Sequence, residues 1–180
     1  ETLVVPTGGE RRRANDTFYR FRPGSDHVWL TGDHDPDSVL VLHPDGEAVL
    51  FARPRSSRDN DNFFRDRNHG ELWVGRRQTL AEKGTELDIA TRDLADLPAV
   101  LDGCPPGRTR VLRGLDPLVD AAVRPIGDRD DELATALSEA RLVKDEWEVA
   151  ALRDAIDATV RGFEDVARVL PADRPVSERL

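Results

Sequence analysis

Residues 38–51 read SVLVLHPDGEAVLF, two apolar runs separated by a turn sequence. Both runs are rich in the β-branched and large apolar residues that favour strands. The Pro-Asp-Gly sequence at 44–46 suits a tight turn, because proline presets its backbone angle and glycine accepts positive φ. This stretch therefore predicts an antiparallel hairpin with strands at 38–42 and 47–51.

Two more apolar runs precede the hairpin. Residues 2–6 read TLVVP, which is typical of a short buried strand, and residues 26–32 read DHVWLTG, which we also expect to be a strand. The polar, arginine-rich residues 9–16 between them predict a loop. With residues 26–32 as the first of three strands, the hairpin becomes part of an antiparallel meander.

From residue 78 onward, helical and strand patterns alternate. We expect short strands at 87–90 and 108–112, and short helices at 78–84, 92–101 and 117–123. A meander followed by alternating strands and helices predicts an α/β fold with a mixed β-sheet flanked by helices.

The last third of the chain predicts two helices. Acidic residues at its start favour a helix over 130–140. Asp145 and Glu148 have the spacing of a capping box, which should begin a helix of roughly 25 residues, ended by Pro171 and Pro175. Its apolar residues recur at steps of three or four: Leu152, Ile156, Val160, Phe163, Val166 and Leu170. A helix of this length is suited to bridging two domains or presenting a face to a partner.

The composition indicates an acidic globular protein. The 180 residues are 38% hydrophobic and 34% charged, with a net charge of -9, and an acidic chain disfavours nucleic-acid binding. Residues 53–77 contain seven arginines interleaved with acidic residues, which predicts a solvated mixed-charge surface and leaves nucleic-acid binding as the alternative. No apolar run approaches the length of a membrane span and no signal peptide is recognisable, so we expect no membrane partner and a cytoplasmic location.

Catalytic and metal-binding motifs are absent from the sequence. The four histidines are scattered, and His34 lies in the acidic segment DHDPD at 33–37. This segment lacks the glycine and closing glutamate of a calcium loop, so we interpret it as a turn between strands. Cys104, the single cysteine, has no ligand or base partner nearby. No GxSxG, GxGxxG or GxxxxGK pattern occurs, so we expect no catalytic residue, metal site or cofactor in this chain.

Four segments, taken in their order, resemble a known family. They read FYRFRPGSDHVWLTGDHDPDSVLVL at 18–42, LFARPRSSRDNDNFF at 50–64, ELWVGRR at 71–77 and RLVKDEWEVAALRDAI at 141–156. Together they resemble the N-terminal domain of aminopeptidase P, the Xaa-Pro aminopeptidase of the creatinase and prolidase group. His27, Asp35 and Asp145 depart from the usual pattern in ways that the fold would accept.

The resemblance implies one part of a two-domain enzyme. Residues 1–143 would form the N-terminal domain, a ribonuclease H-like mixed sheet, and residues 144–180 the linking helix and the start of a C-terminal pita-bread catalytic domain. That domain would hold two divalent metals, commonly manganese, on two Asp, one His and two Glu beyond residue 180, and would hydrolyse the bond before a proline at the second position of a peptide. The present chain, expected to be a fragment, would be inactive alone.

Trp73 has two interpretations from the residues alone, a core position or a binding surface. The resemblance implies the second: the indole would form part of the substrate rim at the active site of a neighbouring subunit in a homodimer or homotetramer. Arg124 is the match for an arginine with the same role. The alternatives that stay open are a free-standing protein-binding module of the same fold and the N-terminal domain of a prolidase.

Overall fold

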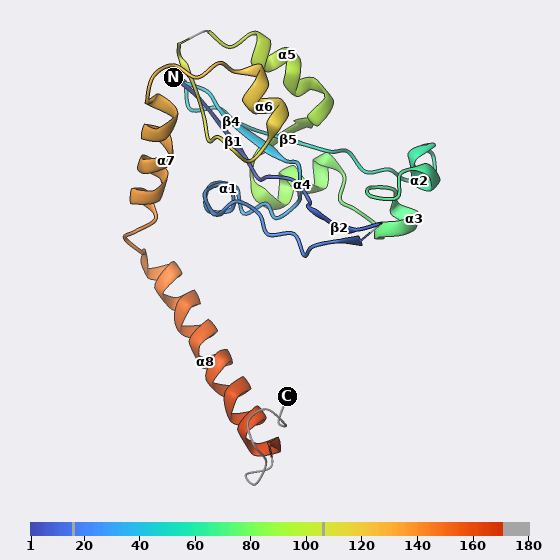
Figure 1. Ribbon diagram of the computed structural model, residues 1–180, viewed down its shortest axis with the longest axis vertical. Helices are drawn as coiled ribbons and strands as arrows, with labels where there is room; N and C mark the ends of the chain where they lie inside the picture. Colours follow the sequence, from blue (N-terminus) through green and yellow to red (C-terminus); the bar gives the residue numbers. More distant parts are fainter. Residues whose placement is uncertain (16, 106, 171–180) are drawn as a thin grey trace. The chain divides into compact units, whose positions relative to one another are not determined.

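The computed structural model describes residues 1–15, 17–105 and 107–170. The chain divides into two compact units, Glu1–Ser138 and Glu139–Leu180 (Figure 1). Pro171 and Pro175, which were expected to end the last helix, lie outside the described residues, as does Asp16.

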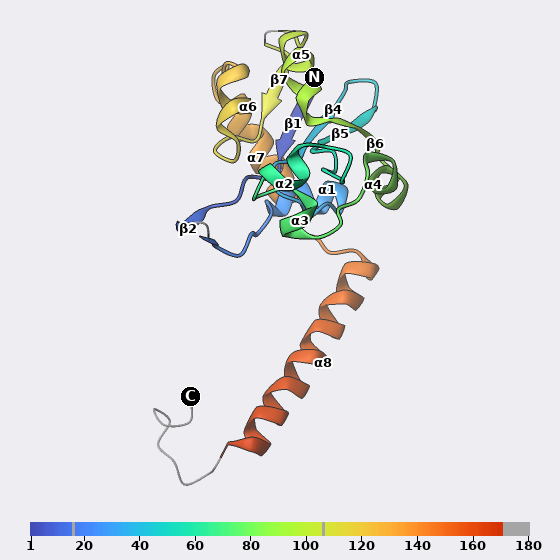
Figure 2. The same ribbon diagram turned by 90° about the vertical axis from the view of Figure 1, so that its right-hand side faces the viewer.

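The first unit is built on a five-stranded sheet with the order β6-β5-β4-β1-β7. Figure 2 shows β7 and β6 at its two edges. The strands are β1 (Thr2–Pro6), β4 (Val39–Leu42), β5 (Ala48–Ala52), β6 (Ala90–Asp93) and β7 (Thr109–Val111). The central strands β1, β4 and β5 pair antiparallel, whereas β6 and β7 pair parallel with their neighbours. The predicted mixed sheet is therefore confirmed.

The β4–β5 hairpin forms at the predicted turn. Val39 pairs with Phe51 and Leu40 with Leu50, and the His43 N–H donates to the Glu47 carbonyl at 2.8 Å to close the loop. Gly46 has a φ of 93°, a conformation that glycine adopts without steric cost. The local turn chemistry thus sets the register of the two central strands.

Side chains alternate between the two faces of the sheet, so both faces are apolar. One face packs against α5 (Leu97–Asp102) and α6 (Pro117–Ala122), and the other against α1 (Ser25–Thr31), α4 (Leu80–Leu87) and α7 (Arg129–Ala140) (Figure 1). The first cluster includes Val4, Val39, Val41, Phe51, Leu97, Leu101 and Val119, and the second Val5, Leu40, Leu50, Leu112, Leu133 and Leu137. The fold is a mixed sheet between two layers of helices.

The prediction of a strand at residues 26–32 is wrong, because this segment forms α1. His27 and Thr31, one helical turn apart, are both buried. The Nδ1 of His27 donates to the Val5 carbonyl at 2.7 Å, and Gly32 ends the helix with a φ of 73°. The third antiparallel strand beside the hairpin is β1 instead. Three antiparallel strands are therefore present, but the third comes from residues 2–6, near the start of the chain, and not from residues 26–32.

Other corrections concern the limits of elements. Within the predicted loop at 9–16 lies β2 (Arg12–Ala14), which pairs with β3 (Thr17–Phe18). Helix α4 does not stop at Gly84, where a Cβ atom would lie 3.0 Å from the Ile89 carbonyl oxygen. Glycine at this position allows the backbone at Ile89 to approach the helix closely. Strand β6 begins at Ala90, later than the predicted residue 87.

The segment 92–101 contains a 3₁₀ turn, η1 (Leu94–Asp96), before α5. The short helices α2 (Asn62–Arg65) and α3 (Glu71–Val74) were not predicted.

The second unit contains α8 (Glu146–Val169), a helix of 24 residues. Its predicted capping box is present: Asp145 accepts from the Glu148 N–H at 2.7 Å, and Glu148 accepts from the Asp145 N–H at 3.0 Å. Apolar side chains of α8 that are exposed include Leu152, Ile156, Val160, Phe163 and Val166. Among the residues that the structure describes, no helix is both long and apolar enough to cross a membrane.

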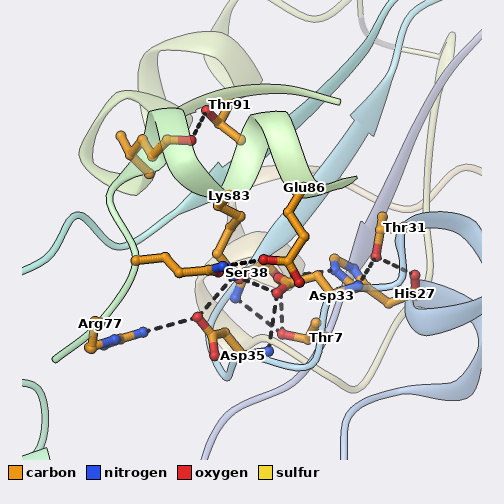
Figure 3. Close-up of polar contacts among 12 residues, drawn as sticks. Thr7, His27, Thr31, Asp33, Asp35, Ser38, Arg77, Lys83, Glu86 and Thr91 are labelled. Carbon is orange, nitrogen blue, oxygen red and sulfur yellow. Dashed lines mark hydrogen bonds and ion pairs between the residues drawn. The ribbon is translucent and has the colours of Figure 1, made fainter. Parts of the chain in front are cut away.

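A buried polar cluster joins α4 to the turn after α1 (Figure 3). Lys83, on α4, donates to Asp33 at 2.5 Å and to Asp35 at 2.9 Å. The His27 Nε2 lies 3.8 Å from the other oxygen of Asp33. The exposed fraction of Lys83 is 5% and that of Asp33 is 4%. Two aspartates of the acidic segment 33–37 therefore pair with Lys83. The segment connects a helix, not a strand, to β4.

The environment of Asp33 keeps its carboxyl ionised. Burial alone would raise the pKa of Asp33, but the neighbouring His27, Lys83 and Ser38 outweigh it and hold the pKa far below the ordinary range. A charge without a partner at this depth would be strongly unfavourable. The position of α4 thus depends on the ion pair.

Lys83→Met tests this dependence. The variant leaves the Asp33 carboxylate buried without its main partner, so the free energy of unfolding should fall by about 3 kcal/mol in a urea titration. The additional change Asp33→Leu should restore part of the loss, because it removes the uncompensated charge. Lys144→Met, at the only other lysine, is the control and should change stability by less than about 0.5 kcal/mol. Equal effects at both lysines would contradict the assignment.

The stability should also depend on pH through Asp33. Its pKa is lower in the folded protein than the value of about 3.9 in the unfolded chain. The stabilising contribution is therefore complete above that value and is lost as the pH falls toward the folded pKa. The stability difference between the wild type and Asp33→Asn should be constant from neutral pH to about pH 5 and should shrink below about pH 4. A difference that is unchanged at low pH would refute this.

Candidate functional site

Trp73 lies on an exposed apolar surface formed by α2 and α3. We call Phe64, Leu72, Trp73 and Val74 the Trp73 patch; their exposed fractions are 60%, 49%, 53% and 48%. None of the four belongs to either core cluster of the sheet. The core interpretation of Trp73 is therefore wrong.

The indole ring is held in place although it is exposed. Its Nε1 donates to the Phe64 carbonyl at 3.0 Å, and the Arg67 guanidinium carbon lies 5.6 Å from the ring centroid. Phe63 is buried and stacks edge-on against Phe64, with centroids 4.8 Å apart. The hydrogen bond and the cation–π contact restrict the ring, so it presents a fixed apolar face.

Gly70 allows α3 to pack against α2. A Cβ atom at this position would lie 2.4 Å from the Asn62 carbonyl oxygen and 2.6 Å from those of Phe63 and Asp66. Real contacts of this length do not occur, and all three atoms are backbone. Only glycine fits, so the segment that carries Trp73 begins at a sterically fixed point.

Glu71 joins α3 to Arg55, which lies in the segment that follows β5. The Arg55 guanidinium donates to both carboxylate oxygens at 2.8 Å, and the Arg77 N–H donates at 3.0 Å. Arg55 first, and then the Arg77 backbone, lower the pKa of the Glu71 carboxyl. A bidentate pair of this kind fixes orientation as well as distance.

Arg77 connects the Trp73 segment with the buried cluster. Its guanidinium lies 3.4 Å from Asp35, whose carboxylate also accepts from Lys83 (Figure 3). The chain is thus fixed before α3 by Gly70, within it by Glu71 and after it by Arg77. Sequence reasoning missed this support, although Lys83 is one of only two lysines beside 24 arginines and could have marked a specific contact.

Arg124 lies elsewhere in the first unit. It is exposed, follows α6, and lines a pocket of ≈ 240 Å³ with Leu101, Cys104 and Ile126 among others. The Cys104 thiol donates to the Val100 carbonyl at 3.3 Å. Figure 1 shows α3 and α6 in different regions of this unit. The structure does not bring Trp73 and Arg124 into one pocket of the described chain.

Candidate metal ligands do not cluster in residues 1–15, 17–105 and 107–170. No group of three or more His, Cys, Asp or Glu side chains there could hold a metal ion. His34 is exposed.

Comparisons with known proteins agree on one family. The family model "Aminopeptidase P, N-terminal domain" matches residues 1–111. Xaa-Pro aminopeptidases 1 and 2 of Streptomyces coelicolor are 46% and 47% identical over 99% of this chain. The chain spans only 37% and 39% of their lengths.

A solved structure supports the fold. A variant of Escherichia coli aminopeptidase P superposes with a TM-score of 0.76 at 22% identity, covering 96% of this chain and 42% of that one. The fold, the family match and the relatives identified by sequence point the same way. The chain belongs to the family of aminopeptidase P N-terminal domains.

Proposed function

We propose that this chain is the non-catalytic N-terminal domain of a Xaa-Pro aminopeptidase, an enzyme that removes the residue before a proline at the second position. The observation that carries the proposal is the identity of 46% to a Xaa-Pro aminopeptidase over 99% of the chain. The chain covers 37% of that relative, so a catalytic domain would follow residue 180. The active site would belong to that domain.

The metal chemistry is assigned to the missing domain. A solved Escherichia coli relative is described as zinc-substituted and in complex with product, which supports a metal-dependent reaction. We propose two divalent ions, manganese in the native enzyme, which would polarise the scissile carbonyl and activate a water molecule. The contribution of the present chain is to shape and support the site.

The Trp73 patch is proposed as part of the substrate rim. An exposed tryptophan that is already ordered loses little conformational freedom when a ligand packs against it. Its apolar face suits a proline ring, and the acceptor at Phe64 fixes its orientation. Because the patch is on the outside of its own unit, we propose that it reaches the active site of a neighbouring subunit in a homodimer or homotetramer. Arg124, on another surface, would contribute positive charge to a rim in the same assembly.

The second unit is proposed as the connection to the catalytic domain. We divide the protein into residues 1–143 and 144–180, the latter including α8 and the start of the C-terminal domain. The exposed apolar face of α8 would pack on that domain, since such a surface is unfavourable in water. We further propose a cytoplasmic location, with which a single free cysteine is compatible.

A second candidate is a free-standing protein-binding module, which the exposed Trp73 patch favours. The parent reading frame discriminates between the two. A downstream domain with two Asp, one His and two Glu as ligands supports the enzyme, and a stop codon after Leu180 supports the module. A third candidate, prolidase, would cleave Xaa-Pro dipeptides and not longer peptides.

The 180-residue chain should show no hydrolysis of an Xaa-Pro peptide above the blank with added Mn²⁺, because the proposed ligands lie outside it. The longer protein is the control and should be active under the same conditions. Product release is measured by chromatography. Turnover by the short chain would overturn the assignment of the reaction to the missing domain.

Trp73→Ala in the longer protein should lower kcat/KM for Xaa-Pro peptides by about tenfold, as for loss of an aromatic hot spot. Its Tm should hardly change, because the ring is half-exposed. Trp29→Ala, at another partly exposed tryptophan on α1, is the matched control and should leave kcat/KM unchanged. If both variants lose activity equally, or neither does, Trp73 is not a rim residue.

A further inference from the structure

A basic pocket of ≈ 320 Å³ lies beside the β2–β3 hairpin. Three arginines line it, Arg11, Arg20 and Arg22, together with Tyr19 and backbone at four glycines. No aspartate or glutamate is among its lining residues in the described chain. The charged residues that line the pocket are therefore all basic, in a protein whose net charge is -9.

These arginines differ from most others in the first unit. Arg53, Arg55, Arg76, Arg77 and Arg113 each pair with a carboxylate. Within the residues that the structure describes, Arg11, Arg20 and Arg22 have no ion pair. Guanidinium groups that line one pocket without a counter-charge repel each other, and an anion bound there relieves this repulsion.

The backbone holds the two arms of the pocket together. The Tyr19 N–H donates to the Arg11 carbonyl at 2.9 Å, and the Gly24 N–H donates to the Thr7 carbonyl at 2.9 Å. A Cβ atom at Gly24 would lie 3.3 Å from a methyl carbon of Leu115 and 3.4 Å from the Thr7 carbonyl oxygen. Gly24 thus packs closely against both the Thr7 backbone and the Leu115 side chain, two residues that also line the pocket.

We propose that this pocket binds an oxyanion carrying two or more negative charges, of the phosphate or polycarboxylate type. Guanidinium groups bind the oxygens of such anions through paired hydrogen bonds. Three guanidinium groups carry enough positive charge to balance an anion with two or three negative charges. The anion would be either a free solute or a pair of carboxylates from the part of the protein beyond residue 180. The second of these, carboxylates from beyond residue 180, rests on the proposed function.

Tyr19 supplies a specific probe, because it is the single tyrosine in the sequence and lines the pocket. In the 180-residue chain labelled with 3-fluorotyrosine, the single ¹⁹F resonance should shift saturably on titration with inorganic phosphate or citrate at constant ionic strength. Half-saturation is expected on the order of 0.1 to 1 mM. Chloride at equal ionic strength should cause no saturable shift.

Two variants distinguish binding in this pocket from a nonspecific effect of the protein's charge on anion affinity. Arg20→Gln combined with Arg22→Gln should weaken binding by about tenfold or more, since each lost guanidinium removes charge-assisted hydrogen bonds. Arg13→Gln, on the same hairpin but outside the pocket lining, should change the affinity less than about twofold. No saturable shift in the wild type, or an equal loss in Arg13→Gln, would overturn the proposal.

A second arm repeats the titration on the longer protein, in which the resonance of Tyr19 is identified by its absence from the Tyr19→Phe variant. A saturable shift there identifies a free solute as the ligand. Binding by the 180-residue chain but not by the longer protein identifies carboxylates of the following domain as the occupant. Because neither readout measures peptide hydrolysis, failure of this proposal is distinct from failure of the proposed enzyme function.

Discussion

The ion pair between Lys83 and Asp33 is the contact on which the arrangement of the first unit depends. It joins residues 50 positions apart in the sequence, and both side chains are nearly inaccessible to water. Removing two charges from water costs about as much as their attraction returns, so such a pair adds little net stability. Its effect is to specify position: α4 has one place in which its ammonium group is satisfied. The turn after α1 is fixed by the same contact.

This constraint extends to the surface that carries Trp73. Asp35 pairs with Lys83, as Asp33 does, and also pairs with the Arg77 guanidinium. The Arg77 backbone N–H in turn donates to the Glu71 carboxylate on α3. A continuous set of charged contacts therefore leads from the interior to the exposed indole. A four-residue helix has little stability of its own. Its geometry is determined by these neighbours and by Gly70, which is why an apolar ring can remain ordered while half-exposed.

Local chemistry explains which elements could be predicted from the sequence. The hairpin at 38–51 and the capping box at Asp145 are set by residues within a few positions, and both are confirmed. The error at 26–32 has a long-range cause, because His27 bonds to Val5, 22 residues away, and the buried helix overrides β propensity. For the same reason no local pattern reveals the partner of Lys83. The residues themselves drew attention to Trp73 and the family resemblance implied a role for it, whereas its support by Gly70 and Glu71 required the structure.

The distribution of charge distinguishes the interior contacts from the surfaces open to partners. Lowered pKa values at Asp33 and Glu71 belong to carboxylates that join segments of the chain, and ionised, paired groups of this kind build structure. Three surfaces have a chemistry that an external group can complement: the apolar Trp73 patch, the apolar face of α8 and the arginine pocket. The Trp73 patch and the arginine pocket lie on different elements of the first unit, and the third surface lies on α8 in the second unit. Each surface therefore offers a distinct chemistry to a neighbouring group, apolar at the Trp73 patch and on α8, and positive at the arginine pocket.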